Sequence, residues 1–158
     1  MEPKNKTKNK PNQLEIELEK RLTSRGLILY AWDYFNSFES LHQQFPKVTD
    51  KFPVKYFLIC HSIELAMKAC LRERGYTRKQ LSNIGHDLEK LIGLLYKQGV
   101  IMDVNSVKRT FILNDYYKTK QFEYPQTGSK SVPALEKMAD ITKLLLNKVS
   151  NDIYKKYP

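Results

Sequence analysis

Apolar residues recur at intervals of three and four positions along almost the whole of this 158-residue chain. That spacing places side chains on one face of an α-helix, whereas strand-like alternation is confined to short pieces, residues 120–124 at most. The pattern predicts an all-α fold, an up-and-down bundle of four to five helices. The length suits a single core, so we expect one helical domain over residues 13–158.

Capping and helix-breaking residues divide this pattern into segments. The first predicted helix covers residues 14–45, with a loosening or break at Gly26, and the second runs from Pro53 to about Arg74. A short helical turn at 78–84, capped by Thr77, and a helix over 86–98 follow. The last two are a helix capped by Asn105 or Ser106 that ends near Tyr117, and a helix over 132–154 capped by Ser131. Residues 118–131 are rich in turn formers and predict a loop.

The chain is basic, with 27 Lys and Arg against 17 Asp and Glu and a net charge of +10. Four lysines and one glutamate place +3 of that charge in residues 1–11, and we expect residues 1–12 to be a disordered basic tail. The largest share, +5, falls in residues 47–80, where eight basic residues face three acidic ones. Such a surface favours RNA, DNA or an acidic protein as partner, although a generally basic protein without a nucleic-acid role has the same composition.

Several protein classes are excluded by what the sequence lacks. The longest apolar run, residues 27–32, is six residues, far below the roughly 20 that span a bilayer, so no membrane association is expected. The basic N-terminus has no apolar core of a secretory signal, and two cysteines are too few for a disulfide framework, which predicts a cytoplasmic protein. Neither a phosphate-binding glycine loop nor a Gly-x-Ser-x-Gly motif is present.

A polar stripe runs along the predicted second helix. At about 100° per residue, His61, Glu64, Lys68 and Arg72 share one narrow face of a helix that is otherwise apolar. Three interpretations are open: a solvated edge with a Glu64–Lys68 pair, an inert buried network, or a site for acid–base chemistry on RNA. In the last, His61 transfers a proton near neutral pH, Glu64 fixes its tautomer and Lys68 holds a phosphate.

The histidines and cysteines give little indication of a metal. Helical di-iron proteins repeat Glu-x-x-His on two helices, whereas this chain has one reversed pair, His61 and Glu64, and a separate His86. Cys-x-x-Cys and His-Glu-x-x-His are absent. We therefore expect neither a metal nor a cofactor. Cys60 and Cys70 fall on the apolar arc of their helix and are expected to be buried and unreactive.

The stretch PVKYFLICHSIELAMKACLRERGYT, followed by IGHDLEKLIGLL, resembles the HEPN superfamily of small helical-bundle proteins. The resemblance lies in His61, Ile63-Glu64-Leu65, Lys68, the Gly75 turn and Gly85-His86-Asp87-Leu88. Many members of that superfamily are metal-independent ribonucleases that act as homodimers. Some are toxins paired with nucleotidyltransferase-type antitoxins, and others serve in phage defence. The resemblance therefore implies RNA association, a homodimer and an antitoxin-type protein partner.

The chain departs from the superfamily in one respect that bears on activity. Those ribonucleases carry an Arg followed by a His after four to six intervening residues. Here the residue that follows Arg109 after six intervening positions is Tyr116, and none of His42, His61 and His86 completes the motif. If catalysis occurs, His61 or His86 takes the acid–base role, whereas His86 also fits a plain role at the start of its helix.

Two main hypotheses follow. The chain is either a divergent metal-independent ribonuclease or a non-catalytic module that binds RNA or a partner protein; a purely structural subunit is a third, plainer reading. In the first, the catalytic residues are His61, Glu64 and His86, and the substrate-binding residues are Lys68, Arg72, Arg109, Tyr116 and Lys118. Aromatic residues interleaved with lysines over 116–124 have the composition of a surface that stacks single-stranded bases, and equally that of a core edge or dimer contact.

Overall fold

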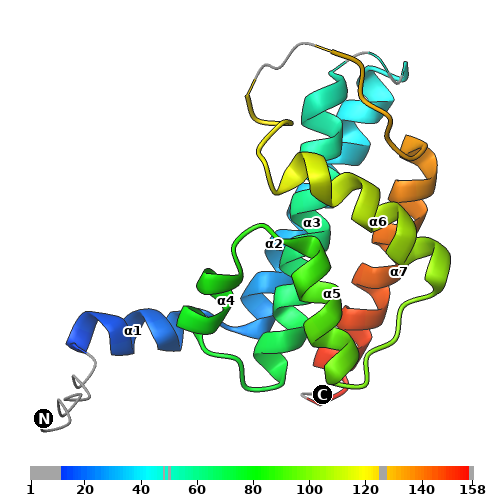
Figure 1. Ribbon diagram of the computed structural model, residues 1–158. Coiled ribbons are helices and arrows are strands. Elements are labelled where there is room, and N and C mark those ends of the chain that lie inside the picture. Colours follow the sequence, from blue (N-terminus) through cyan, green and yellow to red (C-terminus); the bar gives the residue numbers. More distant parts are fainter. Residues whose placement is uncertain (1–11, 48, 50, 125–127, 157–158) are drawn as a thin grey trace, which may run out of the picture.

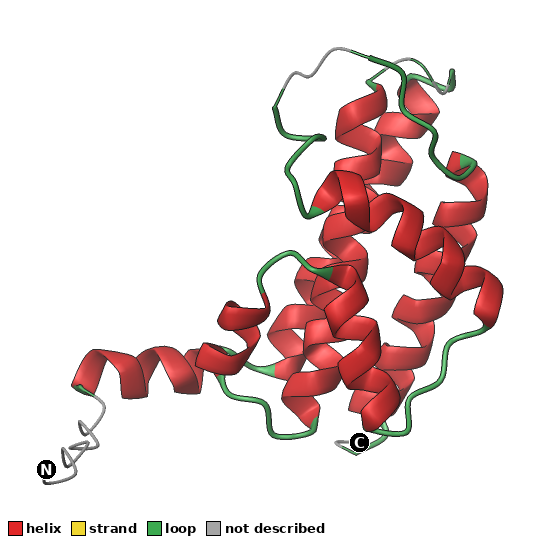
Figure 2. Cartoon of the chain, viewed as in Figure 1, coloured by secondary structure: helices red, strands yellow, loops and turns green. Residues whose placement is uncertain are grey.

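The computed structural model describes residues 12–47, 49, 51–124 and 128–156, and within them the secondary structure is entirely helical (Figure 1, Figure 2). Seven helices follow one another along these described residues: α1 (Gln13–Arg21), α2 (Ser24–Gln44), α3 (Phe52–Glu73), α4 (Arg78–Ile84), α5 (Leu88–Lys97), α6 (Val104–Tyr117) and α7 (Leu135–Tyr154). The all-α prediction is confirmed, although the helices are more numerous than the four to five expected.

Helix α3 is the centre of the fold. It packs against α2, α4, α5, α6 and α7, and side chains around most of its circumference are buried. Its apolar residues Ile59, Ile63 and Met67 are completely buried, and burial of each such side chain stabilises the fold by about 1.5–3 kcal/mol. The Ser62 hydroxyl donates to Ala31 O at 2.8 Å and so fastens α3 to α2. Polar side chains on α3 are therefore held in a rigid, central element.

The predicted first helix is divided in two, but not at Gly26. The break lies at Leu22 and Thr23, because the Thr23 hydroxyl accepts the Gly26 N–H at 3.0 Å and caps α2. A side-chain cap satisfies a backbone donor that has no partner within the helix, whereas glycine only permits a break. Gly26 consequently sits in the first turn of α2. Helix α1 projects from one end of the molecule (Figure 1).

The short helix α4 has the predicted bounds and the predicted cap, with a reciprocal capping box between Thr77 and Gln80. Gly85 ends the segment with a φ of 68°, a conformation that glycine adopts without strain. The next helix was predicted to start at His86 but starts at Leu88, because Asp87 accepts the Lys90 N–H and is the N-cap. His86 therefore lies in a turn.

Two further helix starts were wrong, one because a neighbouring residue supplies the cap and the other because the helix begins without a side-chain cap. Asp103, rather than Asn105 or Ser106, caps α6 by accepting the Ser106 N–H at 3.0 Å. Helix α7 begins at Leu135, so Ser131 lies in the preceding connection. The described parts of the predicted loop at 118–131 contain turns and neither helix nor strand, as expected.

The predicted tail at residues 1–12 lies outside the described residues apart from Asn12. The Asn12 side chain accepts the Glu15 N–H at 2.8 Å and caps α1. Among the described helices, none combines the length and the apolar character that a bilayer crossing requires.

Candidate functional site

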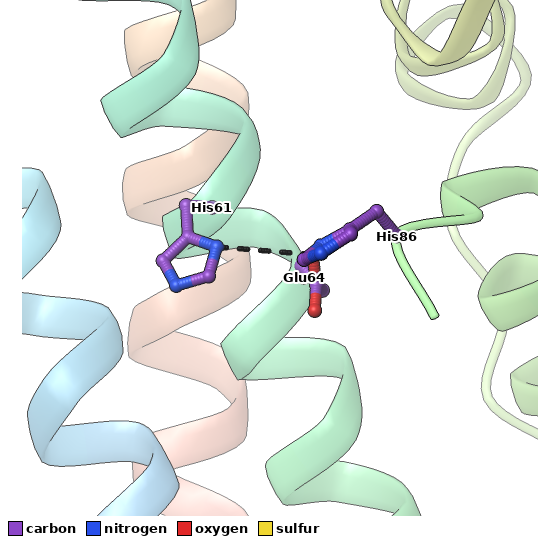
Figure 3. A group of neighbouring side chains, drawn as sticks. All are labelled: His61, Glu64 and His86. Carbon is purple, nitrogen blue, oxygen red and sulfur yellow. Dashed lines mark hydrogen bonds and ion pairs between the residues drawn. The ribbon is translucent and has the colours of Figure 1, made fainter. Parts of the chain in front are cut away.

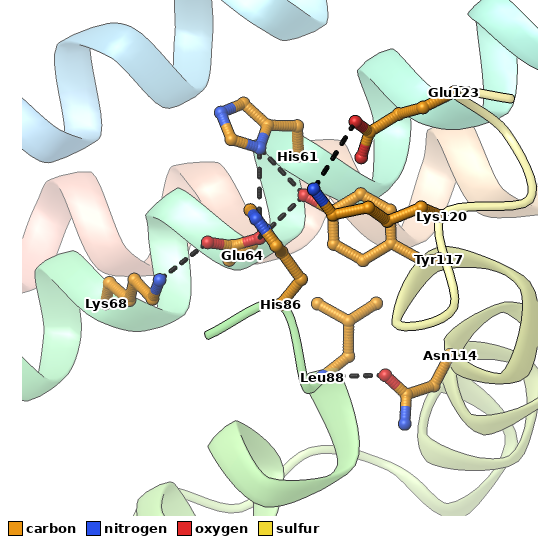
Figure 4. Close-up of polar contacts among 9 residues, drawn as sticks. All are labelled: His61, Glu64, Lys68, His86, Leu88, Asn114, Tyr117, Lys120 and Glu123. Carbon is orange, nitrogen blue, oxygen red and sulfur yellow. Dashed lines mark hydrogen bonds and ion pairs between the residues drawn. The ribbon is translucent and has the colours of Figure 1, made fainter. Parts of the chain in front are cut away.

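Four side chains from three separate segments converge on one face of α3 (Figure 4), and Figure 3 shows three of them, His61, Glu64 and His86. His61 and Glu64 come from α3, where a separation of three residues places them on the same helix face. His86 comes from the turn before α5, and Tyr117 from the last turn of α6. These four residues are called the His–Glu cluster below.

Glu64 is the hub of the cluster and is only 2% exposed. Its Oε1 accepts a hydrogen bond from Lys68 Nζ at 2.6 Å, and its Oε2 accepts from Tyr117 Oη at 2.6 Å and from His86 Nδ1 at 2.8 Å. Burial by itself raises the pKa of Glu64, but the Lys68 ammonium and the hydrogen bonds from Lys68, Tyr117 and His86 outweigh burial and lower it. Glu64 is therefore a buried, fully paired carboxylate.

The tautomer of His61 follows from these bonds. The Tyr117 hydroxyl has one proton, and it donates that proton to the Glu64 carboxylate. Because His61 Nδ1 lies 2.7 Å from the same hydroxyl oxygen, the imidazole must donate its Nδ1–H to Tyr117. Desolvation lowers the pKa of His61, against an opposing influence of Glu64, so the ring is neutral near pH 7 and its lone pair lies on Nε2.

Aromatic neighbours fix the orientation of the His61 ring. Phe57 stacks on it with ring centroids 5.5 Å apart and planes 9° apart, and Tyr34 meets it edge-on at 4.4 Å. The His61 side chain is 19% exposed, against 42% for His86. The cluster is thus enclosed around Glu64 and Tyr117 and open to solvent on the side of the two imidazoles.

The turn that carries His86 is held by Asn114, a buried residue of α6. Asn114 Oδ1 accepts the Leu88 N–H at 2.8 Å, and its Nδ2 donates to Asp87 Oδ1 at 3.2 Å. These bonds place His86 against Glu64, with its ring centroid 6.3 Å from that of His61. Helix α6 therefore positions both Tyr117 and, through the turn, His86.

The structure brings together five of the eight predicted site residues. His61, Glu64 and His86 form the cluster, and Lys68 is tied to it through Glu64. Lys118 lies at its edge, since its ammonium is 3.1 Å from Asp87 Oδ2 in the turn beside His86.

The other three predicted substrate-binding residues lie elsewhere. Arg72 binds the α1 end of the molecule, pairing with the Glu19 carboxylate and donating to the carbonyl oxygens of Glu19, Leu22 and Tyr76. The Tyr116 hydroxyl bonds to the backbone of Ser131. Arg109 is eight positions before Tyr117 on α6, about 12 Å away along the helix axis.

Tyr117 and Asn114 are the functional positions that the sequence did not single out as site residues. They lie three positions apart on the buried face of α6, where a tyrosine hydroxyl and an amide both need partners. This spacing of three residues could have indicated that both side chains face the core. The sequence alone did not distinguish Tyr117 from the adjacent Tyr116, which was predicted as the site residue instead.

The cluster also has the donor atoms of a metal site. His61, Glu64 and His86 each offer one nitrogen or oxygen within 4.8 Å of the others, and within the described residues they are the one group of three with this property. The two histidines are 25 positions apart in the sequence, so no short sequence motif contains both of them.

Comparisons with protein-family models, curated proteins and solved structures found no match to this chain.

Proposed function

We propose that this chain is an RNA-associated domain that cleaves RNA without a metal ion, with His61 as general base and His86 as general acid. One observation carries the proposal: two imidazoles, 6.3 Å apart between centroids, are held by their Nδ1 atoms on one buried carboxylate–tyrosine unit. Their Nε2 atoms are outside these bonds. Two oriented imidazoles are what a reaction needs when one oxygen must lose a proton and another must gain one.

The reaction that fits this pair is internal transphosphorylation of RNA. Neutral His61 removes the proton of a ribose 2′-hydroxyl through Nε2, and the 2′-oxygen attacks the adjacent phosphorus. The bond from phosphorus to the 5′-oxygen breaks, and His86 in its protonated form donates the Nε2 proton to that oxygen. The products are a 2′,3′-cyclic phosphate and a free 5′-hydroxyl. DNA has no 2′-hydroxyl and is not a substrate.

Basic side chains beside the cluster support an anionic substrate. Lys118 is paired with Asp87 next to His86, and Lys120 lies 4.0 Å from Glu123, a carboxylate close enough to influence the pKa of His61. Both lysines are about half exposed, so their ammonium groups are available to phosphates. Lys68 acts indirectly, because its ammonium holds the Glu64 carboxylate in place.

The resemblance to the HEPN superfamily extends the proposal to partners and setting. We propose a HEPN-like homodimer in which the clusters of two copies face a common substrate, within a cytoplasmic toxin–antitoxin or phage-defence system that supplies an antitoxin-type protein partner. The proposed homodimer, setting and partner all rest on the resemblance, which is carried by the residues around His61, Glu64, Lys68 and His86.

One observation favours the alternative, a module that binds RNA or a protein without turnover. The Glu64 carboxylate already accepts three hydrogen bonds, which is also what an inert buried network requires. The alternative predicts salt-sensitive RNA binding with no product.

The test is incubation of a labelled single-stranded RNA with the full chain in EDTA, beside the same sequence as DNA. We expect cleavage of RNA alone, with 2′,3′-cyclic phosphate ends identified by mass spectrometry. His61→Ala and His86→Ala should each lower the rate by about 10²-fold or more. His42→Ala is the control, because that ring stacks on Phe38 in α2. Undiminished cleavage by the His61→Ala, His86→Ala double variant contradicts the proposal, and RNA binding without cleavage supports the alternative.

A further inference from the structure

Three ligand-type atoms of the His–Glu cluster lie around one point. Glu64 Oε2 is 2.8 Å from His86 Nδ1 and 3.8 Å from His61 Nδ1, and each of the three residues offers a ligand-type atom within 4.8 Å of the others. Hydrogen bonds through the Tyr117 hydroxyl and the His86 N–H now connect these residues. A cation bound between the three ligand atoms would replace those hydrogen bonds.

The separations suit a small transition-metal ion. Zn²⁺ binds imidazole nitrogen and carboxylate oxygen at about 2.0–2.2 Å, so neighbouring ligands of a tetrahedral site are roughly 3.4 Å apart. The two distances from Glu64 Oε2, 2.8 and 3.8 Å, lie on either side of that value. Modest side-chain rotation therefore brings the three atoms to coordinating distance.

The donor set and its surroundings favour the same ion. Two imidazoles and one carboxylate bind Zn²⁺ and leave a fourth position for water or for the adjacent Tyr117 oxygen. Asn114 holds the turn that carries His86, so this ligand is oriented by a partner outside the coordination sphere. The exposed edge of His86 provides the entry path.

We infer that His61, Glu64 and His86 form a Zn²⁺ site, and that its occupation switches off the cluster. Coordination through Nδ1 obliges each neutral imidazole to carry its proton on Nε2, the atom assigned to proton transfer at His61. The bound ion also displaces the hydrogen bonds that Tyr117 and His86 donate to Glu64 Oε2, while Lys68 keeps its bond to Oε1. The inhibitory consequence rests on the proposed RNA cleavage, whereas binding of the ion does not.

Lys68 sets the strength of this site. Its ammonium lies 2.6 Å from Glu64 Oε1, cancels the charge of the carboxylate and opposes a second cation. Lys68→Ala should therefore tighten Zn²⁺ binding several-fold. A site formed by unrelated surface groups would not respond in this way.

The binding experiment titrates tag-free full-length protein with Zn²⁺ against a fluorescent chelator, without RNA. We expect one ion per chain, at least ten-fold weaker binding in His61→Ala and in His86→Ala, tighter binding in Lys68→Ala and no change in His42→Ala. Co²⁺ substitution should give the visible bands of a tetrahedral nitrogen–oxygen site, and circular dichroism identifies any variant that fails to fold.

The site is overturned if binding in folded His61→Ala or His86→Ala equals that of the wild type, if Lys68→Ala binds no more tightly, or if the Co²⁺ spectrum shows thiolate ligation by Cys60 or Cys70. Inhibition is measured separately, as a loss of RNA cleavage on adding Zn²⁺ that EDTA reverses. Active protein with Zn²⁺ bound refutes the inhibition. Protein that binds Zn²⁺ but never cleaves RNA refutes the proposed function and leaves the metal site standing.

Discussion

The Tyr117 hydroxyl donates a 2.6 Å hydrogen bond to Glu64 Oε2 and thereby joins the end of α6 to the middle of α3 across 53 positions of sequence. The same oxygen accepts the Nδ1–H of His61, so one hydroxyl connects an imidazole to a carboxylate. Burial and the Glu64 carboxylate raise the pKa of Tyr117, so the hydroxyl is protonated near neutral pH. The tautomer of His61 therefore depends on Tyr117.

Tyr117→Phe tests that dependence. The change deletes a hydrogen bond to a charged, buried group and should lower the free energy of unfolding by about 1.5–3 kcal/mol. Without the Tyr117 hydroxyl, His61 is no longer held in the Nδ1–H tautomer. The nitrogen chemical shifts of the ring, measured by NMR, report this change directly. Tyr116→Phe is the matched control, because that hydroxyl bonds only to the backbone of Ser131 at the surface. Equal stability losses in the two variants would show that the link to Glu64 has no special role.

Glu64→Gln should be among the most destabilising conservative changes in the chain. It leaves the Lys68 ammonium, at the surface edge of the cluster, without its buried partner, and breaking a buried pair costs about 3–5 kcal/mol. The comparison is Glu39→Gln, which loses a surface pair with Lys143 and should cost no more than about 1 kcal/mol. Urea unfolding of the two variants measures the difference, and similar midpoints would contradict the central role of Glu64.

Stability should fall in acid in two stages that belong to the cluster. The folded pKa values of His61 and Glu64 lie below their ordinary values of 6.5 and 4.5, so in each case the unfolded chain binds the proton more readily. The stabilisation is complete above each ordinary value and is lost as the pH falls through it toward the lowered folded pKa.

Unfolding free energies measured from pH 8 to pH 3 check this expectation. His61→Gln should flatten the decline that begins near pH 6.5, and Glu64→Gln the decline that begins near pH 4.5. Comparison with the wild type isolates these two groups from the surface carboxylates. A wild-type stability that rises between pH 7 and pH 5.5 would have the wrong sign and would refute the neutral, desolvated state of His61.

Arg72→Met should release α1 while leaving the bundle folded. Helix α1 has nine residues and buries none of them, and isolated helices shorter than about 12–15 residues are marginal in water. Arg72 supplies its main attachment through Glu19 and Leu22. Hydrogen exchange of residues 13–21 should become at least ten-fold faster. Arg74→Met, which removes a side chain bonded within α3 to Cys70, should leave that exchange unchanged.

The sequence predicted well those features that depend on near neighbours. Helix α3 was placed to within a residue at each end, and the Thr77 cap of α4 was correct, because periodicity and capping act over a few positions. Helix starts were wrong where several polar residues adjoin, as at Asp103 beside Asn105 and Ser106. Which of them caps the helix depends on backbone dihedral angles that composition does not reveal.

The candidate site divides along the same line. By itself the sequence determined that His61, Glu64 and Lys68 share one face of a central helix, since positions three and four apart on a helix are neighbours in any fold. Only the tertiary structure decided that His86 and Tyr117 meet Glu64, and that Arg72 is engaged by α1 instead. The reason is physical: a buried carboxylate must find donors, and which donors reach it depends on how α5 and α6 pack against α3.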